Sequence, residues 1–359
     1  MPADDRTVTQ PQAENTAPRV SIAMVVKIAV LCCSYIAVSS GLIRFNKYLM
    51  NEDRFPFSMA LTSIHMFVSF SLCLVFYLLK PSAFPGMANT QGKRILVLSW
   101  FVPIGAVFAI SLFASNQAYL YCSVTFLQFM KEGNVIITFL LSCAVGLQAL
   151  NRVRAIVILW IIAGSMMAVS GEIKFVFVGF AFQLVSQLAE CSRAVMGEFV
   201  LSGGGLKLDP LSYTMFVAPT CLVVLVVGTA LTWDSKIPAA LHTWQWYLLP
   251  NALLAFVLNV MVASIIKEVS AVGFILTGVC KDIVIVLFSC LFFGEVVTAG
   301  QCMGFTLTLF GVFFWSYLKV NPHSNVARFA ERTLGMPATL QTPPEPTEAT
   351  SLKGIKEKA

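Results

Sequence analysis

Two lysine–acid pairs lie inside long apolar stretches of this sequence and could bind an anion. Lys281-Asp282 interrupts the apolar run 270–294, and Lys131-Glu132 stands in a comparable run earlier in the chain. About 20 apolar residues span a bilayer as a helix, so these pairs are expected within the membrane. An ionisable side chain is costly there unless it is paired or faces a wet cavity. Two such lysines therefore predict an anion pocket, and lysine suits a phosphate group as a point charge.

The acids beside these lysines allow two interpretations. In the first, Asp282 and Glu132 offset the lysine charges while the pocket is empty. In the second, the pair at 281–282 is structural, because adjacent helix residues point about 100° apart and each could bond a neighbouring helix. Glu190 and Arg193 are three residues apart and can pair along their own helix. The sequence leaves open whether these two are structural or part of the site.

Further polar residues in or near the apolar runs could contact a substrate. Tyr213 lies near a helix end, where its ring could stack on a base or a sugar, and Asn116 and Asn259 are embedded amides. The predicted substrate-binding residues are Lys131, Lys281, Asp282, Glu132, Asn116, Asn259 and Tyr213.

No catalytic motif accompanies these residues, so we predict that the chain is not an enzyme and has no catalytic residues. HExxH, GxGD and GxSG with a partnering histidine are absent, and so is a P-loop for ATP hydrolysis. The 10 cysteines form no CxxC motif or Cys/His cluster, so neither a metal site nor a cofactor is expected. The absence of an ATP-binding motif favours secondary transport over an ATP-driven pump.

The composition predicts an all-α membrane protein. The chain has 359 residues, of which 57% are hydrophobic and 12% charged, and its mean hydropathy is +0.80. The net charge of +6 is concentrated in loops and tails, which indicates membrane orientation and not nucleic-acid binding. Ten transmembrane helices are predicted, at about 22–43, 57–80, 95–115, 123–147, 153–171, 174–200, 211–232, 246–266, 270–294 and 298–319.

A weak internal repeat divides these helices into two halves. A shift of 147 residues lays Ser123 on Ser270 and Ser142-Cys143 on Ser289-Cys290. Five helices per half is an odd number, so the halves would have inverted topology, with the substrate site between them. The predicted organisation is a disordered cytosolic N-terminus at 1–21, a first half at 22–171, a second half at 172–319 and a disordered cytosolic tail at 320–359.

Orientation and localisation follow from the charges outside the helices. With ten helices both termini share a side, and the connections on that side carry more Lys and Arg than those opposite, which predicts that both termini are cytosolic. The start is too acidic for a transit peptide, and Lys356 and Lys358 do not have the spacing of a dilysine retrieval signal. We expect the Golgi or another endomembrane, with the ER and plastid-related membranes as alternatives.

Four stretches carry a resemblance to a known family. The sequence resembles the triose-phosphate translocator and nucleotide-sugar transporter family of the drug/metabolite transporter superfamily, over nearly all of 22–319. It is most similar to the subgroup of sugar-phosphate/phosphate translocators with Lys-Asp in the ninth helix. The matching stretches are TFLQFMKEGNVIIT (125–138), LAECSRAVMGEFVLSGGGLKLDPLSYTMFVAPTCLV (188–223), FVLNV to GVCKD (256–282) and FFGEVVTAGQCMGFTLTLFGVFFWSYLK (292–319).

The resemblance implies ten helices in two inverted halves and exchange of an anionic sugar compound for phosphate or a nucleoside monophosphate. The phosphate-binding lysines of helices four and nine fall on Lys131 and Lys281. The plastid triose-phosphate exchangers have Arg after the second lysine, where this chain has Asp282, which argues against a triose phosphate. The GDP-mannose transporters carry Phe-Tyr-Asn-Asn and Gly-Ala-Leu-Asn-Lys where this chain has 215–218 and 277–281, with only the final lysine retained, which argues against a guanine pocket.

These observations predict a secondary-active antiporter that works by alternating access. The leading expectation is exchange of a nucleotide sugar, foremost a UDP-sugar, for a nucleoside monophosphate. The alternative is a translocator of sugar phosphate, or another phosphorylated metabolite, against phosphate. A membrane scaffold or receptor is the hypothesis from another class, against which the matched lysines argue. The expected partners are the anionic substrate, its counter-substrate and the lipid bilayer; a homodimer is left open.

Overall fold

The computed structural model describes residues 22–147, 152–170, 175–203, 206–293, 297–320 and 329. In this part of the chain the secondary structure is helical throughout, with no strand. The predicted disordered N-terminus 1–21 and nearly all of the predicted tail 320–359 lie outside the described residues. The prediction of an all-α protein is confirmed for the described residues.

Eleven α-helices follow one another in the described ranges. They are α1 (Ile22–Leu49), α2 (Ser58–Leu79), α3 (Arg94–Tyr121), α4 (Val124–Lys131), α5 (Asn134–Ala144), α6 (Arg152–Ser170), α7 (Phe177–Glu198), α8 (Pro210–Leu231), α9 (Ile237–Glu268), α10 (Ala271–Phe293) and α11 (Ala299–Val320). Three helices extend well beyond their predicted bounds, and one of them is α1, which continues to Leu49. α9 begins at Ile237, which is buried in an apolar cluster with Leu49 and Phe55, and α3 continues to Tyr121.

Eight candidate membrane spans are long and apolar enough to cross a bilayer. They are Val26–Leu49, Ser58–Leu79, Arg94–Tyr121, Val124–Ala144, Arg152–Ser170, Pro210–Leu231, Ile237–Glu268 and Ala271–Phe292. The α7 helix is not among them, since Gln183, Gln187, Glu190 and Arg193 make it more polar. The apolar part of α11, Ala299–Trp315, is shorter. A membrane protein with several spans is therefore supported, and the predicted number of ten stays a prediction.

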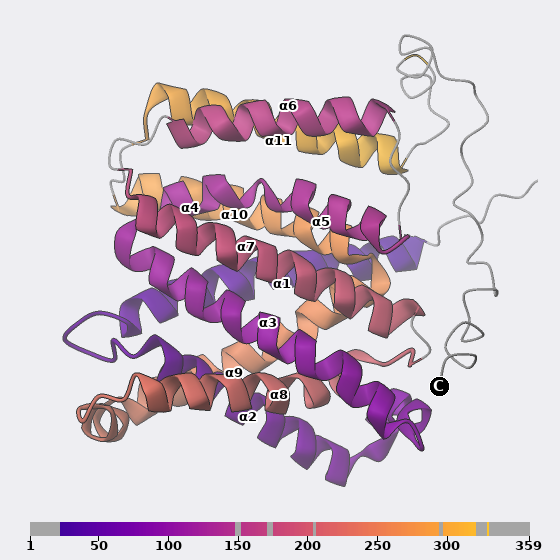
Figure 1. Ribbon diagram of the computed structural model, residues 1–359, viewed down its shortest axis with the longest axis vertical. Helices are drawn as coiled ribbons and strands as arrows, with labels where there is room; N and C mark the ends of the chain where they lie inside the picture. Colours follow the sequence, from indigo (N-terminus) through magenta and orange to yellow (C-terminus); the bar gives the residue numbers. More distant parts are fainter. Residues whose placement is uncertain are drawn as a thin grey trace, which may run out of the picture.

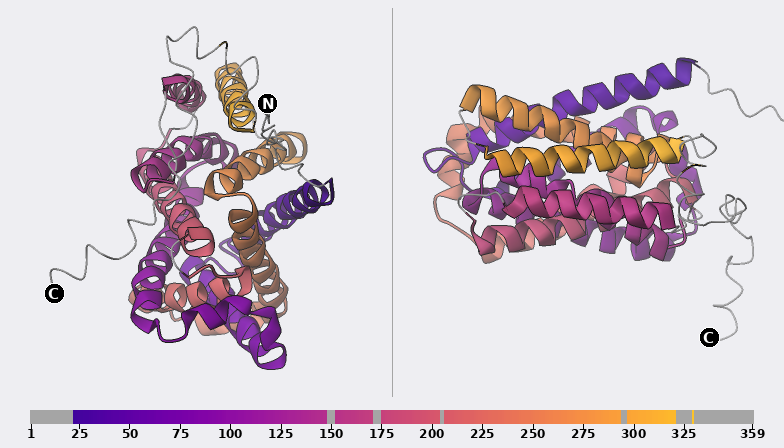
Figure 2. Two further views of the ribbon diagram at one scale, coloured as in Figure 1. Left: turned by 90° about the vertical axis from the view of Figure 1, so that its right-hand side faces the viewer. Right: turned by 90° about the horizontal axis from the view of Figure 1, so that it is seen from above.

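The helices run roughly along one direction and form a bundle (Figure 1). The α6 and α11 helices pair at one edge, α2 and α8 lie at the other, and α4, α5, α7 and α10 lie between them. Figure 2 shows the same bundle end-on, with α6 and α11 set apart from the remaining helices. Close packing of α6 on α11 depends on small residues: a Cβ on Gly304 would lie 2.2 Å from the Ala168 nitrogen. Such small residues let membrane helices approach closely.

Apolar side chains cover the outside of the bundle, while polar side chains are buried within it. Leu79, Ile95 and Trp246 are among the exposed large apolar residues, as expected for a surface that faces lipid. By contrast, Gln128, Gln183 and six further polar side chains of the described residues are completely buried. Buried polar groups are costly unless they are hydrogen-bonded, so they indicate functional or specific packing roles in a membrane protein.

The predicted span 123–147 is interrupted in its middle. Helix α4 ends at Lys131, Glu132 and Gly133 form a turn, and α5 begins at Asn134. Glycine is a weak helix former, and the α7 side chain of Gln187 donates to the Met130 carbonyl at 2.5 Å, satisfying a backbone group near the break. Non-helical backbone at membrane depth is tolerated where protein groups satisfy it. One continuous helix was therefore the wrong prediction for this span.

The start of α8 is tied to the connection between α2 and α3. Asp209 is 8% exposed, and its carboxylate accepts hydrogen bonds from the Gly86 nitrogen at 2.8 Å and from the Ser212 nitrogen at 2.9 Å. The Ser212 hydroxyl donates to the same carboxylate at 2.6 Å. Asp209 thus caps α8 and fixes the short 3-10 segment Pro85–Thr90.

Replacement of Asp209 by alanine should lower the stability of the fold. The change removes an N-cap and leaves the buried Gly86 nitrogen without its acceptor, which together cost about 1–3 kcal/mol. Thermal unfolding of the purified protein in detergent measures the effect. Asp209→Asn keeps one acceptor oxygen, so its unfolding temperature should lie between those of the wild type and Asp209→Ala. An unchanged unfolding temperature for Asp209→Ala would show that these contacts contribute nothing.

Candidate functional site

Lys281 and Asp282 are buried in α10 and pair with each other. Their exposed fractions are 7% and 3%. The Lys281 Nζ atom lies 2.9 Å from Asp282 Oδ1, although the angles do not make this contact a hydrogen bond, so Oδ1 has no hydrogen-bond donor. The long lysine stem bends back on its own helix, which the 100° separation of adjacent residues did not suggest. In the described structure the ammonium group is therefore held by its sequence neighbour.

Lys131 and Glu132 stand at the break between α4 and α5. Glu132 is 1% exposed, and neither of its carboxylate oxygens has a hydrogen-bond partner in the described ranges. Lys131 is half-buried and ends α4. Among the described residues, no carboxylate lies within 4.0 Å of its ammonium group. This turn thus carries a cation and an acid that are not paired with each other.

Helix α10 packs against both α4 and α5, and this contact brings the two lysine–acid pairs into electrostatic range. The Lys131 charge interacts with those of Lys281 and Asp282. The Glu132 carboxyl is repelled by Asp282 and attracted by Lys281. Four of the seven predicted binding residues therefore gather at one place, where the broken helix meets α10.

The α7 helix adds two more charged side chains beside this place. Glu190 accepts a hydrogen bond from the Asn134 amide at 3.3 Å. Arg193 is 7% exposed, its guanidinium lies 4.4 Å from the centre of the Phe108 ring, and its Nε atom has no hydrogen-bond partner. The ion pair that the sequence allowed between Glu190 and Arg193 is not formed. Each of the two instead contacts another helix.

Two other predicted residues gather around Arg193. Tyr213 of α8, 3% exposed, and Asn259 of α9 line a small cavity of about 10 Å³ together with Arg193. The Tyr213 hydroxyl has no hydrogen-bond partner, and the Asn259 amide makes a long contact of 3.5 Å with the Ser69 hydroxyl. Asn116 lies half-buried on α3. The sequence analysis did not place Arg193 in the binding set, although its position in a polar stripe of α7 was a signal.

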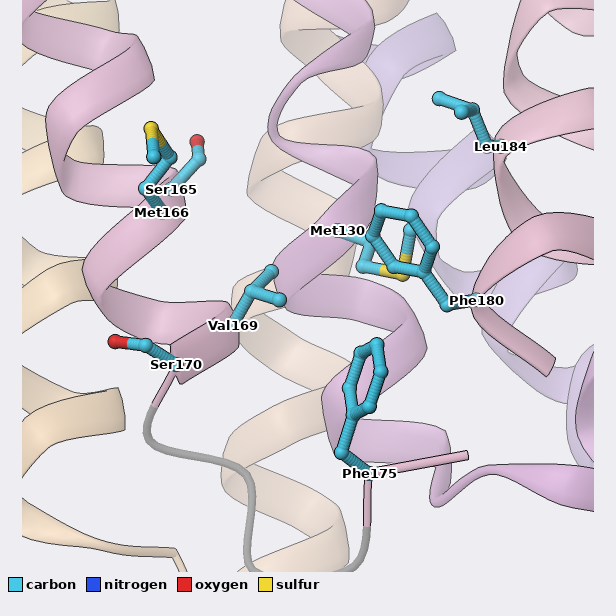
Figure 3. Close-up of a pocket in the computed structure, with 8 residues that line it drawn as sticks. All are labelled: Met130, Ser165, Met166, Val169, Ser170, Phe175, Phe180 and Leu184. Atoms are coloured by element: carbon cyan, nitrogen blue, oxygen red, sulfur yellow. The ribbon is translucent and has the colours of Figure 1, made fainter. Parts of the chain in front are cut away.

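A larger cavity lies beside the broken helix and has a different character (Figure 3). Its volume is about 440 Å³, and none of its lining side chains is charged. Met130, Phe175 and Phe180 form one side, and Val169 with two serines of α6 contributes to the other. Because no cation lines this cavity, it is unsuited to hold a phosphate group. The lysine cluster next to Met130 is the candidate site.

The comparisons with known proteins agree with a bundle of apolar membrane helices. The model of the Triose-phosphate Transporter family matches residues 26–316. This chain belongs to that family of membrane transporters, which confirms the resemblance found in the sequence.

Relatives and a solved structure extend this finding. Three proteins of Arabidopsis thaliana carry the name "probable sugar phosphate/phosphate translocator". They are 32%, 34% and 32% identical over 285, 285 and 301 residues, covering 77%, 77% and 80% of this chain and 83%, 82% and 76% of the relatives. One crystal structure superposes with a TM-score of 0.53 at 12% identity, over 83% of this chain and 99% of its own. At that identity the likeness concerns the fold alone.

Proposed function

We propose that this chain is a secondary-active antiporter that exchanges a sugar phosphate, or another phosphorylated metabolite, for phosphate. One observation carries the proposal: a lysine buried at 7% exposure in α10 lies within electrostatic range of a second lysine at the break between α4 and α5. A buried cation and a half-buried one within a membrane bundle are costly unless an anion uses them. In a family of transporters, that anion is the transported substrate.

The empty site is balanced by its own acids. Asp282 holds Lys281 at 2.9 Å, so a phosphate group must displace this carboxylate to reach the ammonium group. Lys131, which has no carboxylate so close among the described residues, approaches the same phosphate from the α4 side. Asn116, Asn259 and Tyr213 then remain for the sugar or other organic part, and Arg193 joins them because it lines one cavity with the last two. Glu132 contributes to the charge balance beside Lys281.

The relatives favour a sugar phosphate over the nucleotide sugar that the sequence analysis ranked first. Their names are those of sugar phosphate/phosphate translocators. Exchange of a nucleotide sugar for a nucleoside monophosphate is the second candidate. It draws support from Asp282, which stands where the plastid triose-phosphate exchangers carry a second cation, so that the site has one positive charge fewer.

Ten membrane spans in two inverted halves, 22–171 and 172–319, complete the proposal. Helix pairing supports them: α2 packs on α8, the broken α4–α5 helix on α10, and α6 on α11, each with its counterpart in the other half. Likewise α1 packs on α9 as α7 packs on α3.

Both termini are proposed to be cytosolic, in a Golgi or other endomembrane. A tagged chain found in plastids would contradict that location.

Counterflow in proteoliposomes separates the candidate substrates. Vesicles loaded with inorganic phosphate are expected to take up labelled sugar phosphates in a saturable manner, and vesicles loaded with a nucleoside monophosphate to take up nucleotide sugars poorly. The reverse preference would replace the first candidate by the second. Vesicles that exchange neither class, from protein shown to be folded, would contradict transport of both.

A further inference from the structure

The ion pair in α10 leaves its acid without a cation once the substrate is bound. Asp282 is 3% exposed, and its close partner in the structure is Lys281 Nζ at 2.9 Å. The proposed function gives that ammonium group to a phosphate. Because the ammonium group cannot hold both anions equally well in a buried site, Asp282 must lose most of this stabilisation when phosphate binds. A buried carboxylate without a cation or hydrogen-bond donor is strongly disfavoured.

Within the described part of the chain, the cations that act on Asp282 are Lys281 and Lys131. The second cation that acts on Asp282 is Lys131, and the proposed function assigns that lysine to the same phosphate. The nearby acids add repulsion, because Glu190 and Glu132 each interact with Asp282 as a like charge. The ionisable and charged groups around Asp282 are Lys131 and Glu132 at the α4–α5 break, Glu190 of α7, Tyr35 of α1, and Cys280 and Lys281 of α10.

Charge counting points in the same direction. In the empty site Lys281 and Asp282 cancel, and so do Glu190 and Arg193 of α7. A phosphate ester with two negative charges brings more charge than Lys131 alone can neutralise. An ionised Glu132 beside Lys281 enlarges this excess by one charge. A proton on Asp282 reduces the excess by one charge, and the proton leaves again when the phosphate leaves and the carboxylate returns to Lys281.

We propose that Asp282 takes up a proton whenever a phosphate group displaces it from Lys281, so that the chain carries a proton together with its phosphorylated substrate. This inference rests on the proposed function, because it requires phosphate at Lys281. The proton comes from solvent on the side where the substrate enters and bonds to a carboxylate oxygen. No other bond forms or breaks. The coupling is reciprocal, so protons strengthen phosphate binding as phosphate strengthens proton binding.

The test measures protons taken up as the purified protein binds inorganic phosphate, by calorimetry in buffers with different ionisation enthalpies. Wild type should take up close to one more proton per phosphate bound than Asp282→Asn, whose amide cannot titrate. Since uptake accompanies binding, wild-type affinity should fall as the pH rises, by up to about tenfold per pH unit relative to the variant. Phosphate changes its own ionisation in both proteins alike, and the comparison removes that contribution.

Glu190→Gln is the matched control, because it removes another acid, half-buried, that acts on Lys281 but already accepts a hydrogen bond from Asn134. It should still take up a proton when phosphate binds, unlike the Asp282 variants, because phosphate still displaces Asp282 from Lys281. Asp282→Ala, which also lacks an ionisable group, replaces the amide variant if that variant does not fold. Equal uptake in wild type and the Asp282 variant, with phosphate bound to both, would overturn the inference alone. A folded wild type that binds no phosphate at any pH would overturn the proposed function and this inference with it.

Discussion

Lys281→Ala is expected to lower the affinity for a phosphorylated substrate by about 10- to 150-fold. The reason is that a hydrogen bond to a charged group contributes about 1.5–3 kcal/mol, and the variant removes one from the phosphate. It also leaves Asp282, which lies 2.9 Å from the ammonium group in the structure, close to an incoming anion. Lys281→Arg keeps the charge, but its guanidinium is planar and longer, so it should retain only part of the activity.

The measurement is the exchange rate per correctly inserted molecule, with thermal stability followed in parallel. Lys267→Ala is the matched control, because Lys267 is an exposed lysine in the last turn of α9, away from the cluster. It should exchange like the wild type. Near-normal exchange by Lys281→Ala would show that the pair in α10 is structural and that the phosphate is held elsewhere.

Lys131→Ala is expected to produce a loss of similar size, about 10- to 150-fold in affinity, because the two lysines would hold one phosphate from the two sides of the α4–α10 contact. Lys131 has no carboxylate within 4.0 Å in the described part of the chain, so its removal breaks no ion pair there. The folded state should therefore be less disturbed than in Lys281→Ala. Substrate titration of exchange and thermal unfolding of the same sample separate the two effects.

A drop in stability at unchanged affinity would instead assign Lys131 to the helix break. Lys131 is the last residue of α4, where a cation interacts favourably with the helix dipole. Lys131→Arg retains that interaction and should keep the stability of wild type whichever role is correct. The affinity of Lys131→Ala thus decides between a substrate contact and a structural residue.

The sequence predicted the class of fold because apolar runs record directly which segments must avoid water. Runs such as 57–80 and 211–232 coincide with α2 and α8 to within a residue or two. The interruption of 123–147 could not be predicted in the same way. Gly133 was a weak local signal, while Gln187 of α7, which satisfies the Met130 carbonyl, is a tertiary contact between segments over fifty residues apart. Such contacts have no signature in local hydropathy.

The sequence predicted which residue types form the candidate site, but it predicted less well which partners the charged side chains contact. Lysines in an apolar run are rare enough to mark Lys131 and Lys281 from the sequence alone. The partners of the acids depend on which helices meet. Glu190 contacts Asn134 across the α5–α7 interface, and Arg193 lies over Phe108 of α3, whereas the sequence offered only the pair along their own helix. Three-dimensional packing thus decided what helical spacing left open.

The most direct measurement is a structure of this chain with inorganic phosphate bound. The account predicts phosphate oxygens within hydrogen-bond distance of Lys281 Nζ and Lys131 Nζ, and an Asp282 carboxylate moved away from its 2.9 Å contact with Lys281. Phosphate bound at another place, with the Lys281–Asp282 pair intact, would contradict it.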